Sequence, residues 1–278
     1  MTSREEDRRR REIDRLLRDL ERQERRRRSS ASSRDWRGLI ALAITFVLLA
    51  VVVYAVPGLA PVWLREAVGL GPHRLADAVA APATGRYVFT HHQDGDPADP
   101  VAWDPCRSIH YVINPAGGPP GATGLVEQAV ARVEQASGLV FEYGGETDER
   151  PHWDSPVLPV LGTRRPVLVS WARPDEVPQL SGEVAGIGGS VPVGAGDGRL
   201  RYATGGITLD AASFAALATQ PDGVREERAI VLHELGHVVG LAHVADPGEL
   251  MNAANLGLLD FGPGDLAGLA RLGAGRCF

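Results

Sequence analysis

The residues best suited to chemistry in this chain lie between His233 and His243, where the sequence reads HELGHVVGLAH. On a helix, His233 and His237 lie four residues apart on one face, so both imidazoles can reach a single metal ion. Glu234, one position further round, is poorly placed as a third ligand but well placed to act as a general base toward water. Gly240 permits the sharp turn that brings His243 back to the ion. Three imidazole ligands leave one coordination position open, which is typical of catalytic zinc.

The alternative is a helix whose histidines are ordinary surface residues. An HExxH pattern arises by chance in about one of a hundred sequences of this composition. A glycine and a third histidine at fixed spacing lower that figure to roughly one in ten thousand. The pattern therefore favours a metal site.

The pattern HExxHxxGxxH resembles that of the metzincin metallopeptidases, and Met251 stands where these proteins carry a methionine in a tight turn, the Met-turn. The continuation from His243 to Met251 is most similar to the matrixin, or matrix metalloproteinase, branch. Residues 264–272 resemble the C-terminal helix of matrixin catalytic domains. The chain departs from matrixins at Val244, usually Ser, and at Asn252, usually Tyr, and no PRCGxPD cysteine-switch segment precedes the domain.

The resemblance implies an α+β fold, with a twisted mixed β-sheet, a zinc-binding helix, a Met-turn and a C-terminal helix. It implies one catalytic Zn²⁺ and makes Met251 an apolar floor beneath the metal; the alternative is an ordinary core methionine. Matrixins also bind extended substrate along an edge strand. The corresponding residues here are Ala185, Gly186, Ile187 and Gly188. The glycines equally fit an ordinary β-bulge.

An uncharged run of 18 apolar residues extends from Leu39 to Val56, long enough to cross a bilayer. Residues 1–37 hold 14 Arg and 9 acidic residues, a net charge of +5, so the positive-inside rule predicts a cytoplasmic N-terminus and a catalytic domain outside the cell membrane. The alternatives are a cleaved signal peptide and a buried core helix.

The sequence thus predicts four regions. They are a cytoplasmic Arg-rich charged helix at 1–37, a transmembrane helix at 38–56, an extracytoplasmic stalk at 57–85 and a zinc metallopeptidase domain at 86–278. The first region has a short apolar stripe, which is compatible with a solvated helix, with binding to anionic lipid or with dimerisation. The sequence therefore does not determine the oligomeric state. The stripe consists of Ile13, Leu16, Leu17 and Leu20.

Residues 57–278 carry 15 Arg and 26 acidic residues, a net charge of −11, which argues against a nucleic-acid partner. The chain has no Lys and is rich in Ala, Gly, Arg and Pro, a composition typical of GC-rich bacterial genomes. Within the domain, hydrophobic patterns predict strands with one early helix and a later helix that carries the histidine motif. The strands are expected at 108–113, 139–143, 167–171, 182–193 and 200–209, and the helices at 123–137 and 225–239.

A second, structural zinc is possible but has weak support. The candidate ligands lack compact spacing, so surface or core positions explain them better. They are His91, His92, His110 and His152. Calcium is a similar case: Asp197 and Asp210 could bind it, as matrixin loops do, but turn chemistry explains both residues equally well.

The chain has two cysteines, Cys106 and Cys277, both in the region expected outside the cell. We predict a disulfide between them, because free cysteines are unusual in an oxidising compartment. The competing hypothesis makes Cys106 a latency thiolate on the metal, but the surrounding switch motif is missing.

Together these patterns predict a membrane-anchored, extracytoplasmic zinc endopeptidase that cleaves protein or peptide substrates, with Glu234 as general base. One alternative is a zinc-binding but non-proteolytic ectodomain that recognises cell-surface polymers. The presence of Glu234 argues against it, since a binding module needs no base. Another is a membrane scaffold that acts through its charged N-terminal helix.

Overall fold

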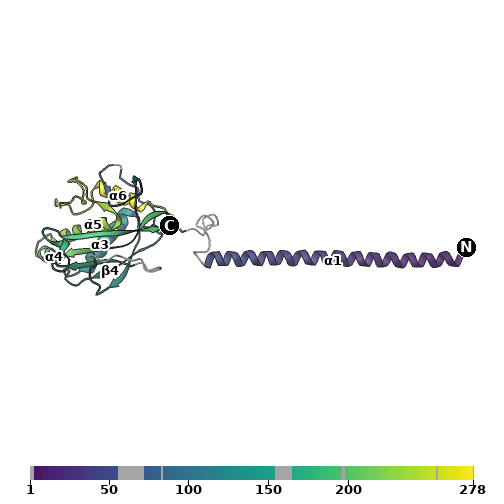
Figure 1. The fold of residues 1–278 in the computed structure, drawn as a ribbon. Coiled ribbons are helices and arrows are strands. Elements are labelled where there is room, and N and C mark those ends of the chain that lie inside the picture. The colour runs from purple at the N-terminus through teal and green to yellow at the C-terminus, as the bar shows by residue number, and fades with distance from the viewer. Residues whose placement is uncertain are drawn as a thin grey trace. The chain divides into compact units, whose positions relative to one another are not determined.

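The computed structural model has two compact units, Met1–Gly71 and Pro72–Phe278, which are described separately (Figure 1). The residues whose structure can be described are 3–55, 72–82, 84–153, 165–195, 198–254 and 256–277.

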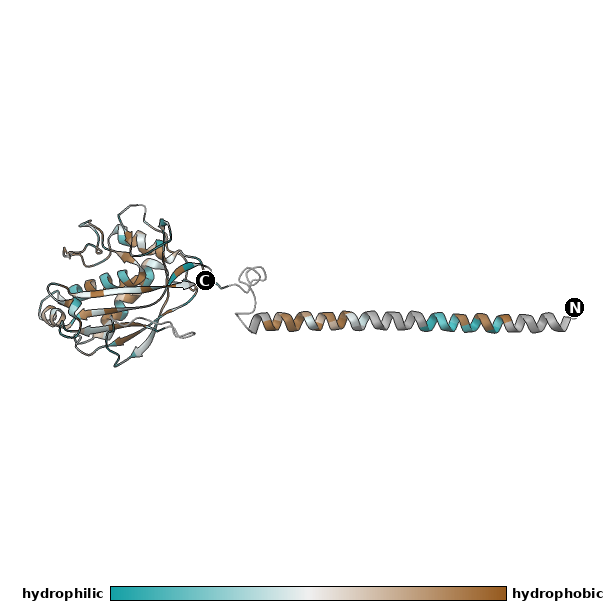
Figure 2. Cartoon of the chain, viewed as in Figure 1, coloured by the Kyte–Doolittle hydropathy of each residue, from teal (hydrophilic) through white to brown (hydrophobic). Residues whose placement is uncertain are grey.

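The described part of the first unit is the helix α1 (Ser3–Ala55), which joins the Arg-rich segment and the apolar run without a break. Figure 2 shows the change along this helix from hydrophilic residues to hydrophobic ones. The described helix includes residues 39–55 of the apolar run. Within the described ranges, no helix is both long enough and apolar enough to span a bilayer. The predicted transmembrane helix at residues 38–56 is therefore wrong.

The second unit is mixed α/β and is built on a five-stranded sheet with the order β5-β4-β6-β8-β7. Four strands run parallel, and β7 pairs antiparallel with β8 at one edge. Each strand lies close to a segment that the sequence pattern predicts. The strands are β4 (Ile109–Asn114), β5 (Phe141–Glu146), β6 (Val167–Ala172), β7 (Gly186–Ala195) and β8 (Arg199–Asp210).

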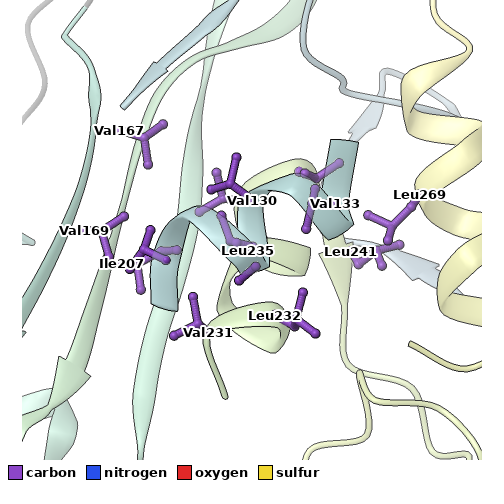
Figure 3. Close-up of a cluster of buried hydrophobic side chains, with 14 of the residues drawn as sticks. Val130, Val133, Val167, Val169, Ile207, Val231, Leu232, Leu235, Leu241 and Leu269 are labelled. Carbon is purple, nitrogen blue, oxygen red and sulfur yellow. The ribbon is translucent and has the colours of Figure 1, made fainter. Parts of the chain in front are cut away.

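Two long helices, α3 (Ala122–Ser137) and α5 (Gly223–Val239), pack on the sheet and against each other. Figure 3 shows the core they form, in which Val130 of α3 and Leu235 of α5 meet Ile207 of β8. Three further helices are shorter: α4 (Ala211–Leu217), α6 (Pro263–Gly273) and the 3₁₀ helix η1 (Pro178–Leu180).

Two small antiparallel sheets complete the unit. In one, β1 (Val88–Phe89) pairs with β9 (Leu241–Ala242), the strand that follows α5. In the other, β2 (His92–Gln93) pairs with β3 (Asp96–Pro100). Through β1, the beginning of the domain therefore lies next to the chain that leaves α5.

The compact unit begins before residue 86, inside the segment expected to be a stalk. The Arg74 guanidinium donates hydrogen bonds to the carbonyl oxygens of Gly273 and Gly275, at 2.8 and 3.2 Å. A disulfide joins Cys106 to Cys277, the pair predicted from the sequence. Both connections attach the C-terminal residues that follow α6 to earlier parts of the domain.

Candidate metal centre

Helix α5 and the turn after it bring three histidines together. His233 and His237 lie on α5, and the helix ends at Gly240, whose φ of 128° is a backbone conformation that favours glycine. A Cβ at Gly240 would also lie 3.0 Å from the Tyr202 ring. After this turn, β9 leads directly to His243. One turn of α5 thus carries His233 and His237, and the short strand β9 brings His243 back to them.

The Nε2 atoms of the three histidines form a small triangle. They lie 3.0 Å apart between His233 and His243, and 3.2 Å apart between His237 and each of the others. Ligands of a tetrahedral zinc, at a Zn–N distance of about 2.0–2.1 Å, lie about 3.3–3.4 Å apart. The distances between the Nε2 atoms are thus slightly shorter than the distances between the ligand atoms of a tetrahedral zinc site. Among the residues whose placement is described, these three form the one His, Cys, Asp and Glu group able to hold a metal.

The hydrogen bonds of the Nδ1 atoms show which nitrogen of each ring carries the proton and which carries the free lone pair. Nδ1 of His233 lies 2.8 Å from the Leu250 carbonyl oxygen, and Nδ1 of His237 lies 2.8 Å from the Leu241 carbonyl oxygen. A carbonyl only accepts, so both Nδ1 atoms carry the proton. Burial lowers the pKa of His233 and of His237 to about 4, so both rings are neutral at pH 7. Their Nε2 lone pairs therefore face each other, and a bound cation relieves that repulsion.

Glu234 lies beside the three histidines but points toward the sheet. Its side chain is 5% exposed, and burial raises the pKa of its carboxyl to about 8. No hydrogen-bond partner for this carboxyl lies within the described part of the chain. A buried carboxyl without a protein partner, next to three imidazoles that could hold a metal, is available to exchange protons with water or substrate.

The edge strand β7 covers α5 at close range. A Cβ at Gly186 would lie 2.9 Å from Cγ of Glu234, and one at Gly188 would lie 2.5 Å from the Glu234 backbone oxygen. These two glycines are thus required by the packing of β7 on α5. The sequence pattern left substrate binding or a bulge as their possible roles and gave no sign of this packing.

A pocket of about 360 Å³ opens between β7, α5 and the loop after the Met-turn. It gathers the three histidines, Glu234 and all four residues predicted from the edge strand. Its lining also includes apolar residues of α5 and of the loop around Met251, namely Ala229, Ile230, Leu250 and Ala253, together with Asn252.

Met251 lies under the histidines and is 1% exposed. A Cβ at Gly236, between the two helix ligands in sequence, would lie 2.5 Å from the Met251 sulfur, so the glycine of HELGH makes room for the methionine. The Met251 carbonyl accepts a hydrogen bond from the Val244 backbone N–H at 3.0 Å. This bond ties the turn to the segment that carries His243.

Two buried carboxylates that the sequence analysis missed hold this turn. Asp265, at the start of α6, accepts hydrogen bonds from the backbone N–H groups of Leu250 and Gly262, at 2.6 and 3.0 Å. Glu249 accepts them from Gly264 and Asp265, at 2.8 and 2.9 Å. An acidic residue in the first turn of a helix, after Gly-Pro-Gly, is the sequence feature that could have indicated such a cap.

The other metal candidates lie apart from this centre. His91 contacts Tyr202, His110 lies near Glu142, and His152 lies near Glu149. His92 lies in the short strand β2. Asp210 caps α4, where its carboxylate accepts hydrogen bonds from the Ser213 backbone N–H and hydroxyl at 2.8 and 2.7 Å. Asp197 lies outside the described residues.

Comparisons with known proteins add little to this geometry. No protein-family model matches the chain, and no characterised protein matches it by sequence. A solved structure described as the "GM1 bound form of the ECX AB5 holotoxin" is similar at a TM-score of 0.35 and 13% sequence identity, over 61% of this chain and 81% of that chain. A likeness at this level carries no argument about fold or function.

Proposed function

We propose that this protein is a zinc-dependent endopeptidase of the metzincin type. The observation that carries the proposal is the triangle of imidazole Nε2 atoms 3.0–3.2 Å apart, two of which have their Nδ1 proton fixed by a backbone carbonyl. This donor set fits Zn²⁺, which prefers neutral imidazole nitrogen and tetrahedral geometry. His233, His237 and His243 would hold the ion.

When bound, Zn²⁺ supplies Lewis acidity, which polarises the scissile carbonyl and makes water a better nucleophile at neutral pH. Glu234 accepts the proton of the attacking water and then delivers it to the departing amine. Burial raises the carboxyl's affinity for that proton, and the positive charge of a bound Zn²⁺ would favour the ionised form that accepts it. Removal of the base should cost about 10²–10⁴-fold in turnover.

An extended peptide fits the substrate site. Strand β7 lies at the edge of the sheet and pairs on one side only, with β8. Its first residues line the pocket that contains the histidines. An extended chain can add to such an edge through backbone hydrogen bonds. The apolar residues that line the pocket, among them Leu250, would accept an apolar side chain of the substrate.

The Cys106–Cys277 disulfide supports a location outside the reducing cytoplasm. In such a compartment the enzyme would act on extracellular or surface proteins.

The test is cleavage of casein by the purified full-length protein. We expect cleavage that stops when 1,10-phenanthroline removes the metal and returns when Zn²⁺ is restored. Intact casein in the presence of about one bound zinc per chain would contradict the peptidase proposal and favour a non-proteolytic zinc-binding domain instead.

A further inference from the structure

The short strand β1 lies against the chain that leaves the active-site helix, and its next residue, Thr90, makes two hydrogen bonds to that chain. The Thr90 backbone N–H donates to the Gly240 carbonyl at 2.9 Å. Its hydroxyl donates to the Leu241 carbonyl, also at 2.9 Å. The same Leu241 oxygen accepts the Nδ1 proton of His237 at 2.8 Å. One carbonyl therefore joins Thr90 to a metal-site histidine.

The segment that contains Thr90 is held in place on both sides of this contact. Before it, Arg86 is packed so closely on α6 that a Cβ at Gly264 would lie 2.2 Å from the Arg86 carbonyl oxygen. After it, Nδ1 of His91 lies 3.0 Å from the hydroxyl of Tyr202, a buried residue of β8. With both ends held, the Thr90 hydroxyl has a defined position toward Leu241.

We propose that Thr90 is a positioning residue of the metal centre, an inference that rests on the proposed function. Its hydroxyl fixes the direction of the Leu241 carbonyl, and that carbonyl fixes the ring orientation and the tautomer of His237. An outer partner of this kind typically changes metal affinity about 10–100-fold when it is removed. The residue lies 147 positions before His237 in the sequence, and β1 brings it to the site.

The experiment compares zinc affinity in the full-length protein and three variants, measured by competition with a chromogenic chelator. Thr90→Val keeps the shape of the side chain but removes the donor, whereas Thr90→Ser restores the donor. Thr123→Val is the matched control, because the hydroxyl of Thr123 on α3 donates to Glu146 of β5 at 2.8 Å, outside the metal centre. Thermal unfolding of the zinc-free proteins reports any general loss of stability.

We expect Thr90→Val to raise the zinc Kd about 10–100-fold. Thr90→Ser and Thr123→Val should stay within about threefold of the wild type, and the zinc-free Thr90→Val protein should unfold close to the Thr123→Val control. Equal Kd values for Thr90→Val and wild type would overturn the inference. So would a weakened Kd that Thr90→Ser fails to restore. Absence of zinc binding in the wild type would instead refute the proposed function, and this inference with it.

Discussion

Alanine substitution at three neighbouring glycines of β7 tests how the sheet positions the active-site helix. Gly186 faces the Glu234 side chain, Gly188 faces the Glu234 backbone, and Gly189 faces open space, with no atom within 4 Å of a built Cβ. All three have φ values outside the left-handed region, so alanine adds volume without backbone strain. The series therefore separates packing on α5 from any general effect of alanine in β7.

The expected magnitudes follow from these distances. Gly188→Ala places a methyl group 2.5 Å from a helix carbonyl oxygen, so α5 or β7 must shift. Overpacking of this kind costs about 1–3 kcal/mol. For a domain of this size, that lowers Tm by roughly 2–12 °C. Gly189→Ala should leave stability unchanged or raise it by about 0.4–1 kcal/mol, because alanine restricts the unfolded chain.

Gly186→Ala should affect turnover more than stability. Its methyl group would lie 2.9–3.0 Å from Cγ and Oε1 of Glu234, atoms that a rotation of the side chain can move. That rotation displaces the general base, and a displacement of about 1 Å can cost 10²-fold in rate. Zinc content should remain at the wild-type level, because no metal ligand moves.

Thermal unfolding, bound zinc and casein turnover of the three variants provide the assay. We expect Gly188→Ala to lose stability and turnover, Gly186→Ala to lose mainly turnover, and Gly189→Ala to retain both. Equal Tm values for Gly188→Ala and Gly189→Ala would refute the close packing of β7 on α5. Wild-type turnover in Gly186→Ala would contradict the assigned position of the Glu234 carboxyl.

Three further results are expected. Asp265→Asn should lower the free energy of unfolding by about 2–3 kcal/mol in urea titrations, because the carboxylate accepts backbone hydrogen bonds from the Met-turn, and an unchanged midpoint would contradict this role. Joint replacement of Cys106 and Cys277 by serine should cost about 2–5 kcal/mol by the same measurement, and equal stability would show that the bridge does not constrain the chain. Burial raises the pKa of Glu234 to about 8, so the zinc-free folded protein retains a proton that the unfolded chain releases above about pH 4.5. Its stability should therefore fall as pH rises from about 7 to 8, above the range in which the buried histidines change the stability, and Glu234→Gln should flatten this slope; identical slopes would contradict the raised pKa.

Local patterns in the sequence predict that the three histidines come together, because these residues are close in sequence. The spacing of His233, His237 and His243 requires only a helix and one turn. Strand and helix positions follow similarly from hydrophobic periodicity, as α3 shows: the pattern predicts 123–137 and the helix is Ala122–Ser137. The comparisons leave the resemblance to metzincins untested.

Features that depend on distant contacts could not be predicted in the same way. The glycines of β7 could serve a bulge, a substrate or a packed helix, and only the position of α5 explains Gly186 and Gly188. Thr90 carries no pattern, since its role depends on the pairing of β1 with β9. The apolar run from Leu39 to Val56 was long enough by residue count, but no helix in the described part of the chain is both long enough and apolar enough to span a bilayer.

The central claim is that three histidines hold zinc while Glu234 handles protons. The most direct measurement determines bound zinc and casein turnover together in Glu234→Gln, with His237→Ala as the comparison. We expect Glu234→Gln to retain about one zinc per chain and to lose turnover about 10²–10⁴-fold, whereas His237→Ala should lose both. Zinc lost from Glu234→Gln, or turnover retained by it, would contradict the account.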